Sequence, residues 1–91
     1  MGFLDIWKHL EYSVSKKYYY NKRSNIKMEE SKLIDGLMQF GLTRQEASIY
    51  ICLASNRELS GYEVSKITGI SRSNVYSALA SLVEEGAAYL L

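Results

Sequence analysis

A face of short polar side chains is the part of this 91-residue sequence best suited to chemistry. It falls on a helix predicted over residues 72–85, where Ser and Asn side chains can hydrogen-bond base edges or phosphates. Arg72 lies in the first turn, beside free amides that favour a phosphate. The face predicts a helix that enters the major groove of DNA, although a solvated face on a structural helix has the same composition. The candidate DNA-binding residues are Arg72, Ser73, Asn74, Tyr76, Ser77 and Ser81, with Ser60 and Lys66 from the preceding helix.

The segment that must position this face has the features of a helix-turn-helix. Ser60 and Glu63 form a predicted capping box that opens a helix through Ile67. Gly69 can adopt the positive φ that a tight turn requires, and Ser65 is small where the second helix passes over the first. A chance helical hairpin rarely combines these features with apolar residues in register, so the segment predicts a helix-turn-helix. The apolar residues are Val64, Ile67 and Ile70 on one side of the crossing and Val75, Ala78, Leu79 and Leu82 on the second helix.

Two more helices are predicted upstream, each with a recognisable end. Thr43 and Glu46 form a second capping box that opens a helix to about Ser55, and Gly41 ends the helix before it. Gly86 stops the last helix, and the chain that follows is long enough for one short strand. These elements predict an all-α fold, or α with a minimal β strand. The expected inner faces are formed by Leu33, Ile34, Leu37, Met38 and Phe40, and by Ala47, Tyr50, Ile51 and Ala54.

An added amphipathic helix is predicted over residues 3–20, because apolar residues recur there at three- and four-residue steps. Its stripe is too large to leave in water and admits three roles: dimerisation, docking onto the chain's own domain, or binding to a membrane surface. We favour dimerisation and favour membrane binding least. The predicted division is residues 1–28 for this helix with a basic linker and 29–91 for the helix-turn-helix domain. The stripe contains Phe3, Ile6, Trp7, Leu10, Val14 and Tyr18.

Charge gives a weaker signal than the motif. The chain has 11 basic and 10 acidic residues, which is close to neutral for a DNA-binding domain. The basic residues gather in one segment without acidic residues, which is either a solvated linker or an arm that contacts phosphates. Both interpretations remain open. The segment contains Lys16, Lys17, Lys22, Arg23 and Lys27.

Catalysis is not predicted. His9 is the only histidine and Cys52 the only cysteine, so neither a histidine-based dyad nor a Cys/His metal cluster can be assembled around the core. The six glycines are scattered rather than grouped in a phosphate-binding loop. Cys52 is expected to be a small buried apolar residue. We predict a protein without cofactor or metal ion that is not an enzyme, and the absence of a signal peptide or long apolar run predicts a soluble cytoplasmic protein.

Residues 37–86 resemble the N-terminal winged-helix domain of TrmB-type transcriptional regulators, many of which respond to sugars. The resemblance implies a winged-helix DNA-binding domain that acts as a dimer on operator DNA. It also places Arg72, Ser73, Asn74, Tyr76 and Ser77 on the recognition helix. The matching residues are Phe40-Gly41-Leu42-Thr43, Glu46-Ala47, Tyr50, Leu53, Gly61-Tyr62-Glu63-Val64, Thr68-Gly69-Ile70, Arg72-Ser73, Val75-Tyr76, Ala78-Leu79, Leu82-Val83-Glu84 and Gly86.

The sequence departs from that family pattern after the last helix. A winged helix has a β-hairpin there, whereas this sequence reaches only the first strand, and no sensor region follows. We expect a fragment of a longer regulator rather than a reduced protein. The predicted function is that of a sequence-specific DNA-binding regulator, with a homodimer and double-stranded DNA as partners. The alternative is a protein-interaction or dimerisation module on the same scaffold without DNA binding.

Overall fold

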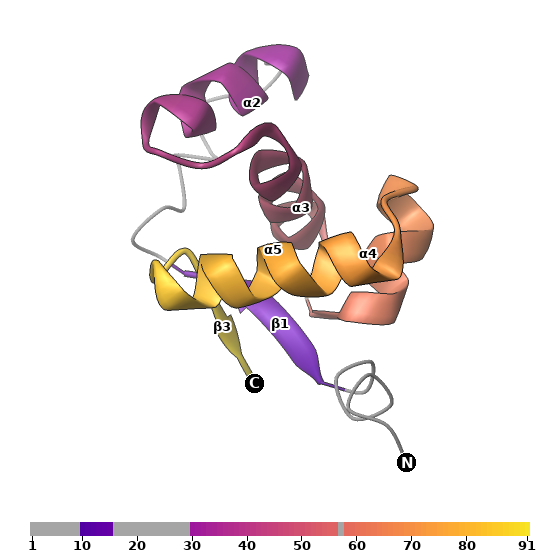
Figure 1. Cartoon of the computed structure of the whole chain (residues 1–91). Helices are drawn as coiled ribbons and strands as arrows, with labels where there is room; N and C mark the ends of the chain where they lie inside the picture. The colour runs from indigo at the N-terminus through magenta and orange to yellow at the C-terminus, as the bar shows by residue number, and fades with distance from the viewer. Residues whose placement is uncertain (1–9, 16–29, 57) are drawn as a thin grey trace.

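The computed structural model describes residues 10–15, 30–56 and 58–91. Figure 1 shows α5 running across the molecule, with β1 and β3 on one side of it and α3 and α2 on the other. This mostly helical fold with a small antiparallel sheet confirms the predicted fold class. The described elements are β1 (Glu11–Val14), α2 (Glu30–Gln39), α3 (Arg44–Ser55), β2 (Leu59–Ser60), α4 (Gly61–Thr68), α5 (Arg72–Glu84) and β3 (Ala88–Leu90).

Both predicted capping boxes are present. At the start of α3, the Thr43 amide donates to Glu46 Oε1 at 2.9 Å and the Glu46 amide donates to Thr43 Oγ1 at 3.1 Å. At the start of α4, Glu63 Oε1 accepts from the Ser60 amide at 2.9 Å and the Glu63 amide donates to Ser60 Oγ at 3.2 Å. These reciprocal bonds satisfy amides that a helix N-terminus otherwise leaves unpaired, so they fix where α3 and α4 begin.

The predicted N-terminal helix is wrong at residues 11–14, which form the strand β1. Period and propensity favoured a helix, but pairing with two neighbouring strands overrides such local preferences. Tyr12 has no exposed surface, and Leu10 and Val14 pack partly buried against the core. Those two residues of the apolar stripe therefore cover the chain's own domain. The rest of the stripe and the basic segment lie outside the described residues.

The sheet has the strand order β2-β1-β3, with β1 antiparallel to both neighbours. Tyr12 is opposite Leu59 on one side and Leu90 on the other. The ladder with the C-terminal strand continues beyond both ends, because the Ser15 amide donates to the Ala87 carbonyl at 2.8 Å and the Leu91 amide donates to the Glu11 carbonyl at 3.0 Å. The strand predicted after Gly86 is confirmed as β3, and its partner comes from the N-terminal part of the chain.

The core lies between α3, α5 and the sheet, with α4 and α2 packed on α3. Cys52 is buried as predicted, and burial raises the pKa of its thiol. Three apolar residues depart from the expected interior: Met38 is 38% exposed, Ile67 is 57% exposed, and Phe40, which follows the end of α2, is 64% exposed. At a helix end the neighbouring turns no longer enclose a side chain, so the helical period overestimates its burial. The largest fully buried side chains are Tyr12, Ile49, Leu53, Leu79, Leu82, Val64 and Val75.

Candidate nucleic-acid interface

The turn between α4 and α5 is held by side chains as well as by its glycine. Gly69 is left-handed with φ 78°, as predicted, and its amide donates to the Ser65 carbonyl at 2.9 Å. The Ser65 hydroxyl donates to the Ile70 carbonyl at 2.7 Å. Thr68 Oγ1 donates to the Val64 carbonyl at 2.8 Å and accepts from the Ile70 amide at 3.2 Å. The turn therefore presents α5 at a fixed angle to α4.

The start of α4 lies directly against α5. A Cβ placed on Gly61 would overlap the ring of Tyr76, so only glycine permits this approach. Val64, Val75 and Leu79 are fully buried where the two helices pack. The α4–turn–α5 unit thus has the close crossing and apolar contact that a helix-turn-helix requires.

The outer face of α5 is short, polar and exposed, as predicted. Arg72, Ser73, Asn74 and Ser77 are exposed, and Ser81 is half-buried near the C-terminal end. Ser71 caps the helix, because its Oγ accepts from the Asn74 amide at 3.4 Å. Most of the predicted face is therefore available to a ligand.

Two predicted site residues are not available. Tyr76 is only 6% exposed, because the helical period turns its ring toward Gly61 and the core. Ser60 is buried, and its hydroxyl is used by Glu63, from whose amide it accepts and to whose Oε1 it donates at 3.2 Å. Neither side chain presents a free polar group at the surface of α5, so both predicted DNA contacts are corrected to structural roles.

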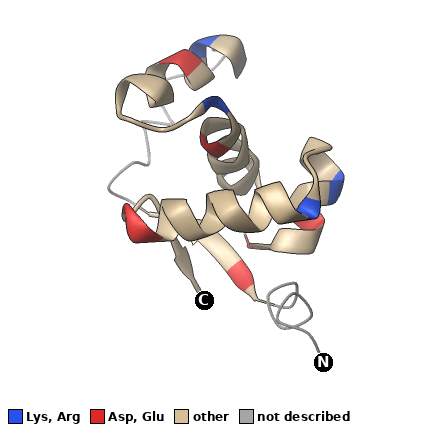
Figure 2. Ribbon diagram, viewed as in Figure 1, with Lys and Arg blue, Asp and Glu red and all other residues tan. Residues whose placement is uncertain are grey.

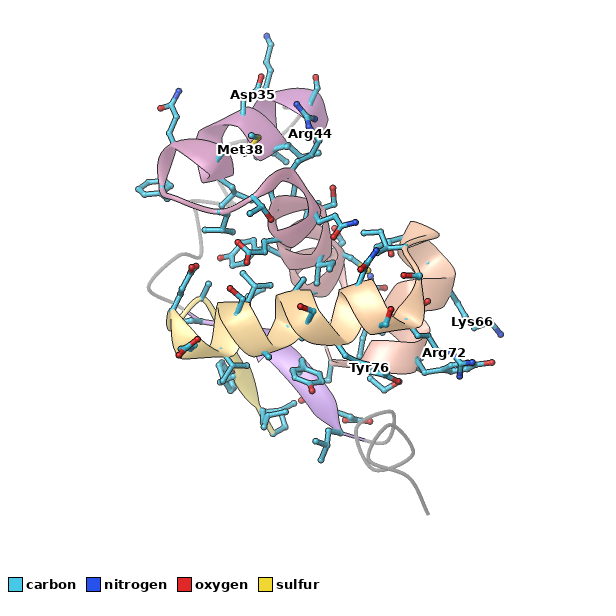
Figure 3. The ribbon with its side chains drawn as sticks, viewed as in Figure 1. Asp35, Met38, Arg44, Lys66, Arg72 and Tyr76 are labelled. Atoms are coloured by element: carbon cyan, nitrogen blue, oxygen red, sulfur yellow. The ribbon has the colours of Figure 1, made fainter. Side chains whose placement is uncertain are left out.

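Three exposed residues form a cluster at the end of the molecule where α4 meets the start of α5. They are Tyr62 and Lys66 on α4 and Arg72 on α5. Lys66 Nζ lies over the Tyr62 ring at 5.3 Å from its centroid, and Arg72 Cζ lies over the same ring at 5.7 Å. Both distances are within the range of cation–π attraction. Figure 3 shows Lys66 and Arg72 projecting together from one end of the molecule, with Arg44 and Asp35 at another. We name Tyr62, Lys66 and Arg72 the Tyr62 cluster.

Sequence reasoning included Lys66 and Arg72 but missed Tyr62. The four-residue spacing of Tyr62 and Lys66 on one helix face was a usable signal. The approach of Arg72 to the Tyr62 ring has no such signal in the sequence, because it depends on how α5 crosses α4.

The charges of α5 are reversed with respect to its dipole. Arg72 is the first residue, no acidic residue lies in the first turn, and Glu84 and Glu85 occupy the C-terminal end. A helix is normally stabilised by anions at its N-terminus and cations at its C-terminus, each by roughly 0.3 to 1 kcal/mol. Figure 2 shows blue beside a red segment at the α4–α5 end, and red at the opposite end of α5. Arg72 and the helix amides supply positive charge where the exposed polar face begins, and Glu63 in the first turn of α4 is the acidic residue of that helix.

The crossing of α4 and α5, the exposed face of α5 and the short strand that follows it define a helix-turn-helix domain of winged-helix-like form. A profile of the family described as "Sugar-specific transcriptional regulator TrmB" matches residues 37–90. The chain belongs to this family, whose members are regulators of transcription. The resemblance seen in the sequence is thereby confirmed.

One curated relative also matches part of the chain. The chain is 35% identical over 57 residues to the uncharacterized protein YrhO of Bacillus subtilis (strain 168), a match that covers 63% of this chain and 21% of the relative. The chain therefore spans about a fifth of the length of that relative. No solved structure matches the chain.

None of the helices in residues 10–15, 30–56 and 58–91 combines the length and apolar character needed to cross a bilayer. Within the same ranges, no three His, Cys, Asp or Glu side chains come together as a group that could hold a metal ion.

Proposed function

We propose that this chain is a DNA-binding transcriptional regulator that places α5 in the major groove of operator DNA. The observation that carries the proposal is a cation in the first turn of α5, followed by a face of exposed short polar side chains. Arg72 and the free amides beside it would attract a backbone phosphate. Ser73, Asn74 and Ser77 are short enough to let the helix backbone approach base edges.

We further propose that the protein acts in the cytoplasm as a homodimer. A single small domain with a net charge of +1 gains limited affinity from phosphate contacts. Two linked copies on one duplex gain affinity because the second binding event is effectively intramolecular. The dimer would read two half-sites about one helical turn, or a multiple of one, apart. Phe3, Ile6 and Trp7 are the proposed dimer contacts.

The test is a fluorescence anisotropy titration, preceded by selection of preferred sequences from a duplex library. We expect the affinity of the selected duplex to fall steeply between about 50 and 200 mM salt, because phosphate binding releases counterions. Arg72→Ala should weaken binding to every sequence and lower the salt slope by about 1, whereas Asn74→Ala should relax the base preference at one position. Sedimentation of the complex should give two chains per duplex.

Arg44→Ala is the matched control, because Arg44 is also an exposed first residue of a helix but lies away from α5. It should leave the salt slope unchanged. Undetectable or salt-independent binding by the parent chain would contradict the proposal, as would equal effects of the two Arg substitutions.

A protein-interaction module without DNA binding is the second candidate. The near-neutral charge favours it, and so does exposed apolar surface at Tyr89, Leu90 and Leu91, which are 44%, 43% and 57% exposed. It predicts stable capture of a protein partner together with no shift of any selected duplex. Loss of that capture in Leu90→Ser, with DNA binding absent throughout, would favour this candidate.

A further inference from the structure

We infer that Tyr62 is a positioning residue for DNA binding, whose ring holds Lys66 and Arg72 in place to grip one stretch of phosphate backbone. The inference rests on the proposed function and adds a residue that makes no base contact itself. Three observations carry it: the geometry of the Tyr62 cluster, the rigidity of the backbone at Tyr62, and the polarity of α5.

The geometry brings two cations from different helices onto one ring. Lys66 and Arg72 lie over Tyr62 at 5.3 and 5.7 Å from the ring centroid. Attraction to the electron-rich ring holds each of the two cations near Tyr62. Tyr62 is 40% exposed, so the position of its side chain is not explained by burial in the core. Its contacts with Lys66 and Arg72 give this surface side chain the role of holding the two cations in place.

The backbone under the ring is held firmly. Gly61, the preceding residue, lies against the Tyr76 ring, and the Ser60–Glu63 capping box encloses Tyr62 on both sides. Arg72 in turn follows the Ser71 cap of α5. The backbone is therefore held in place at both Tyr62 and Arg72, and the Tyr62 ring is a stable surface for the long side chains of the cluster.

Preorganisation is the expected consequence. Free Lys and Arg side chains lose rotamer freedom when they bind a phosphate, and this loss reduces affinity. Side chains already placed on Tyr62 have given up part of that freedom before DNA arrives. Because the cluster lies at the positive end of α5, the held cations and the helix amides would act on the same backbone segment.

The test uses the full chain, the selected duplex and four variants. Tyr62→Phe keeps the ring and should bind like the parent. Tyr62→Leu removes the ring face and should weaken binding about fivefold, which is the size expected when a long side chain loses its rotamer freedom only on binding. In a Lys66→Ala/Arg72→Ala background, adding Tyr62→Leu should cause no further loss, because Tyr62 acts through those two cations.

A readout without DNA separates positioning from folding. In the free parent, the ring should shift the NMR signals of the Lys66 Cε protons and the Arg72 Cδ protons, and these shifts should persist in Tyr62→Phe and vanish in Tyr62→Leu. Urea unfolding should show that Tyr62→Leu remains folded.

The outcomes are distinguishable. Parent binding with an unaffected Tyr62→Leu variant overturns this inference and leaves the proposed function standing. A fivefold loss that persists in the Lys66→Ala/Arg72→Ala background also overturns it, because Tyr62 would then act independently of the cations. Absence of any duplex binding by the parent overturns the proposed function, and the inference with it.

Discussion

Gly61 lies against the ring of Tyr76 so closely that a Cβ at residue 61 would overlap ring carbons Cε1 and Cδ1. This relationship sets how near the start of α4 comes to the middle of α5. It buries Tyr76, which sequence reasoning had placed at the DNA surface, and it brings Tyr62 within reach of Arg72. A contact between one glycine and one tyrosine therefore shapes the whole candidate interface.

Gly61→Ala should lower the free energy of unfolding by about 1 to 3 kcal/mol, because the added methyl group must displace the Tyr76 ring or separate the helices. Gly36→Ala is the matched control. Gly36 is exposed within α2, and a Cβ there meets no atom within 4 Å. It should raise the free energy of unfolding by about 0.5 to 1 kcal/mol through helix propensity. Urea denaturation of both variants checks the difference in sign, and a stable Gly61→Ala variant would contradict the close approach.

Glu84→Gln should stabilise the protein. Glu84 is the last residue of α5, where its carboxylate opposes the negative end of the helix dipole. Neutralising it should raise the free energy of unfolding by about 0.3 to 1 kcal/mol at low salt, and the gain should shrink at high salt. Urea denaturation at two salt concentrations measures this. A loss of stability, or a gain that is independent of salt, would show that the dipole does not act on this carboxylate.

Tyr12→Ala should be among the most damaging single substitutions. The Tyr12 side chain is fully buried in the central strand, and removing a large core side chain of this kind costs about 3 to 5 kcal/mol. Tyr89→Ala on the neighbouring strand is the control, because Tyr89 is 44% exposed and should cost less than about 1 kcal/mol. Thermal unfolding of the two variants tests the placement of β1. Equal costs would indicate that Tyr12 is not a core residue.

Tyr12 should also make the protein sensitive to alkali. Burial raises the pKa of its phenol well above the usual range, and the neighbouring Tyr76 acts in the same direction. Since the folded state holds the proton more tightly than the unfolded state, this contribution to stability is complete below the unfolded pKa of about 10 and is lost as pH rises above it. In Tyr12→Phe the free energy of unfolding should decline less steeply above pH ~10 than in the parent. Urea denaturation at each pH measures this decline. Identical declines in the two proteins would exclude Tyr12 as the cause.

The local features of the fold could be predicted from the sequence because their causes are local. The capping boxes at Thr43 and Ser60 depend on residues three positions apart, and the turn at Gly69 depends on one residue's freedom of φ. The helical period also identified the buried and exposed faces of α5 correctly except at Tyr76, which lies on the boundary between them.

The features that escaped prediction depend on segments far apart in the chain. Nothing near Tyr12 in the sequence indicates that Leu59 and Leu90 lie on either side of it. The apolar spacing around Tyr12 therefore predicts a helix rather than the strand that forms. The Tyr62 cluster likewise required the crossing of α4 and α5. The exposure of Ile67, near the C-terminal end of α4, is a third feature that the periodic pattern does not predict.

The central place of β1 has a consequence for how the protein forms during synthesis. The ribosome makes Tyr12 early, yet one of its strand partners lies beyond α3 and the other beyond α5. The helices can form as they emerge, but the pairing of β1 with β3 must wait until Leu90 is free, and it joins distant parts of the chain at an entropic cost. Until then one edge of β1 lacks its partner strand in a nascent chain that already contains its helices, and an unpaired strand edge of this kind is prone to aggregation.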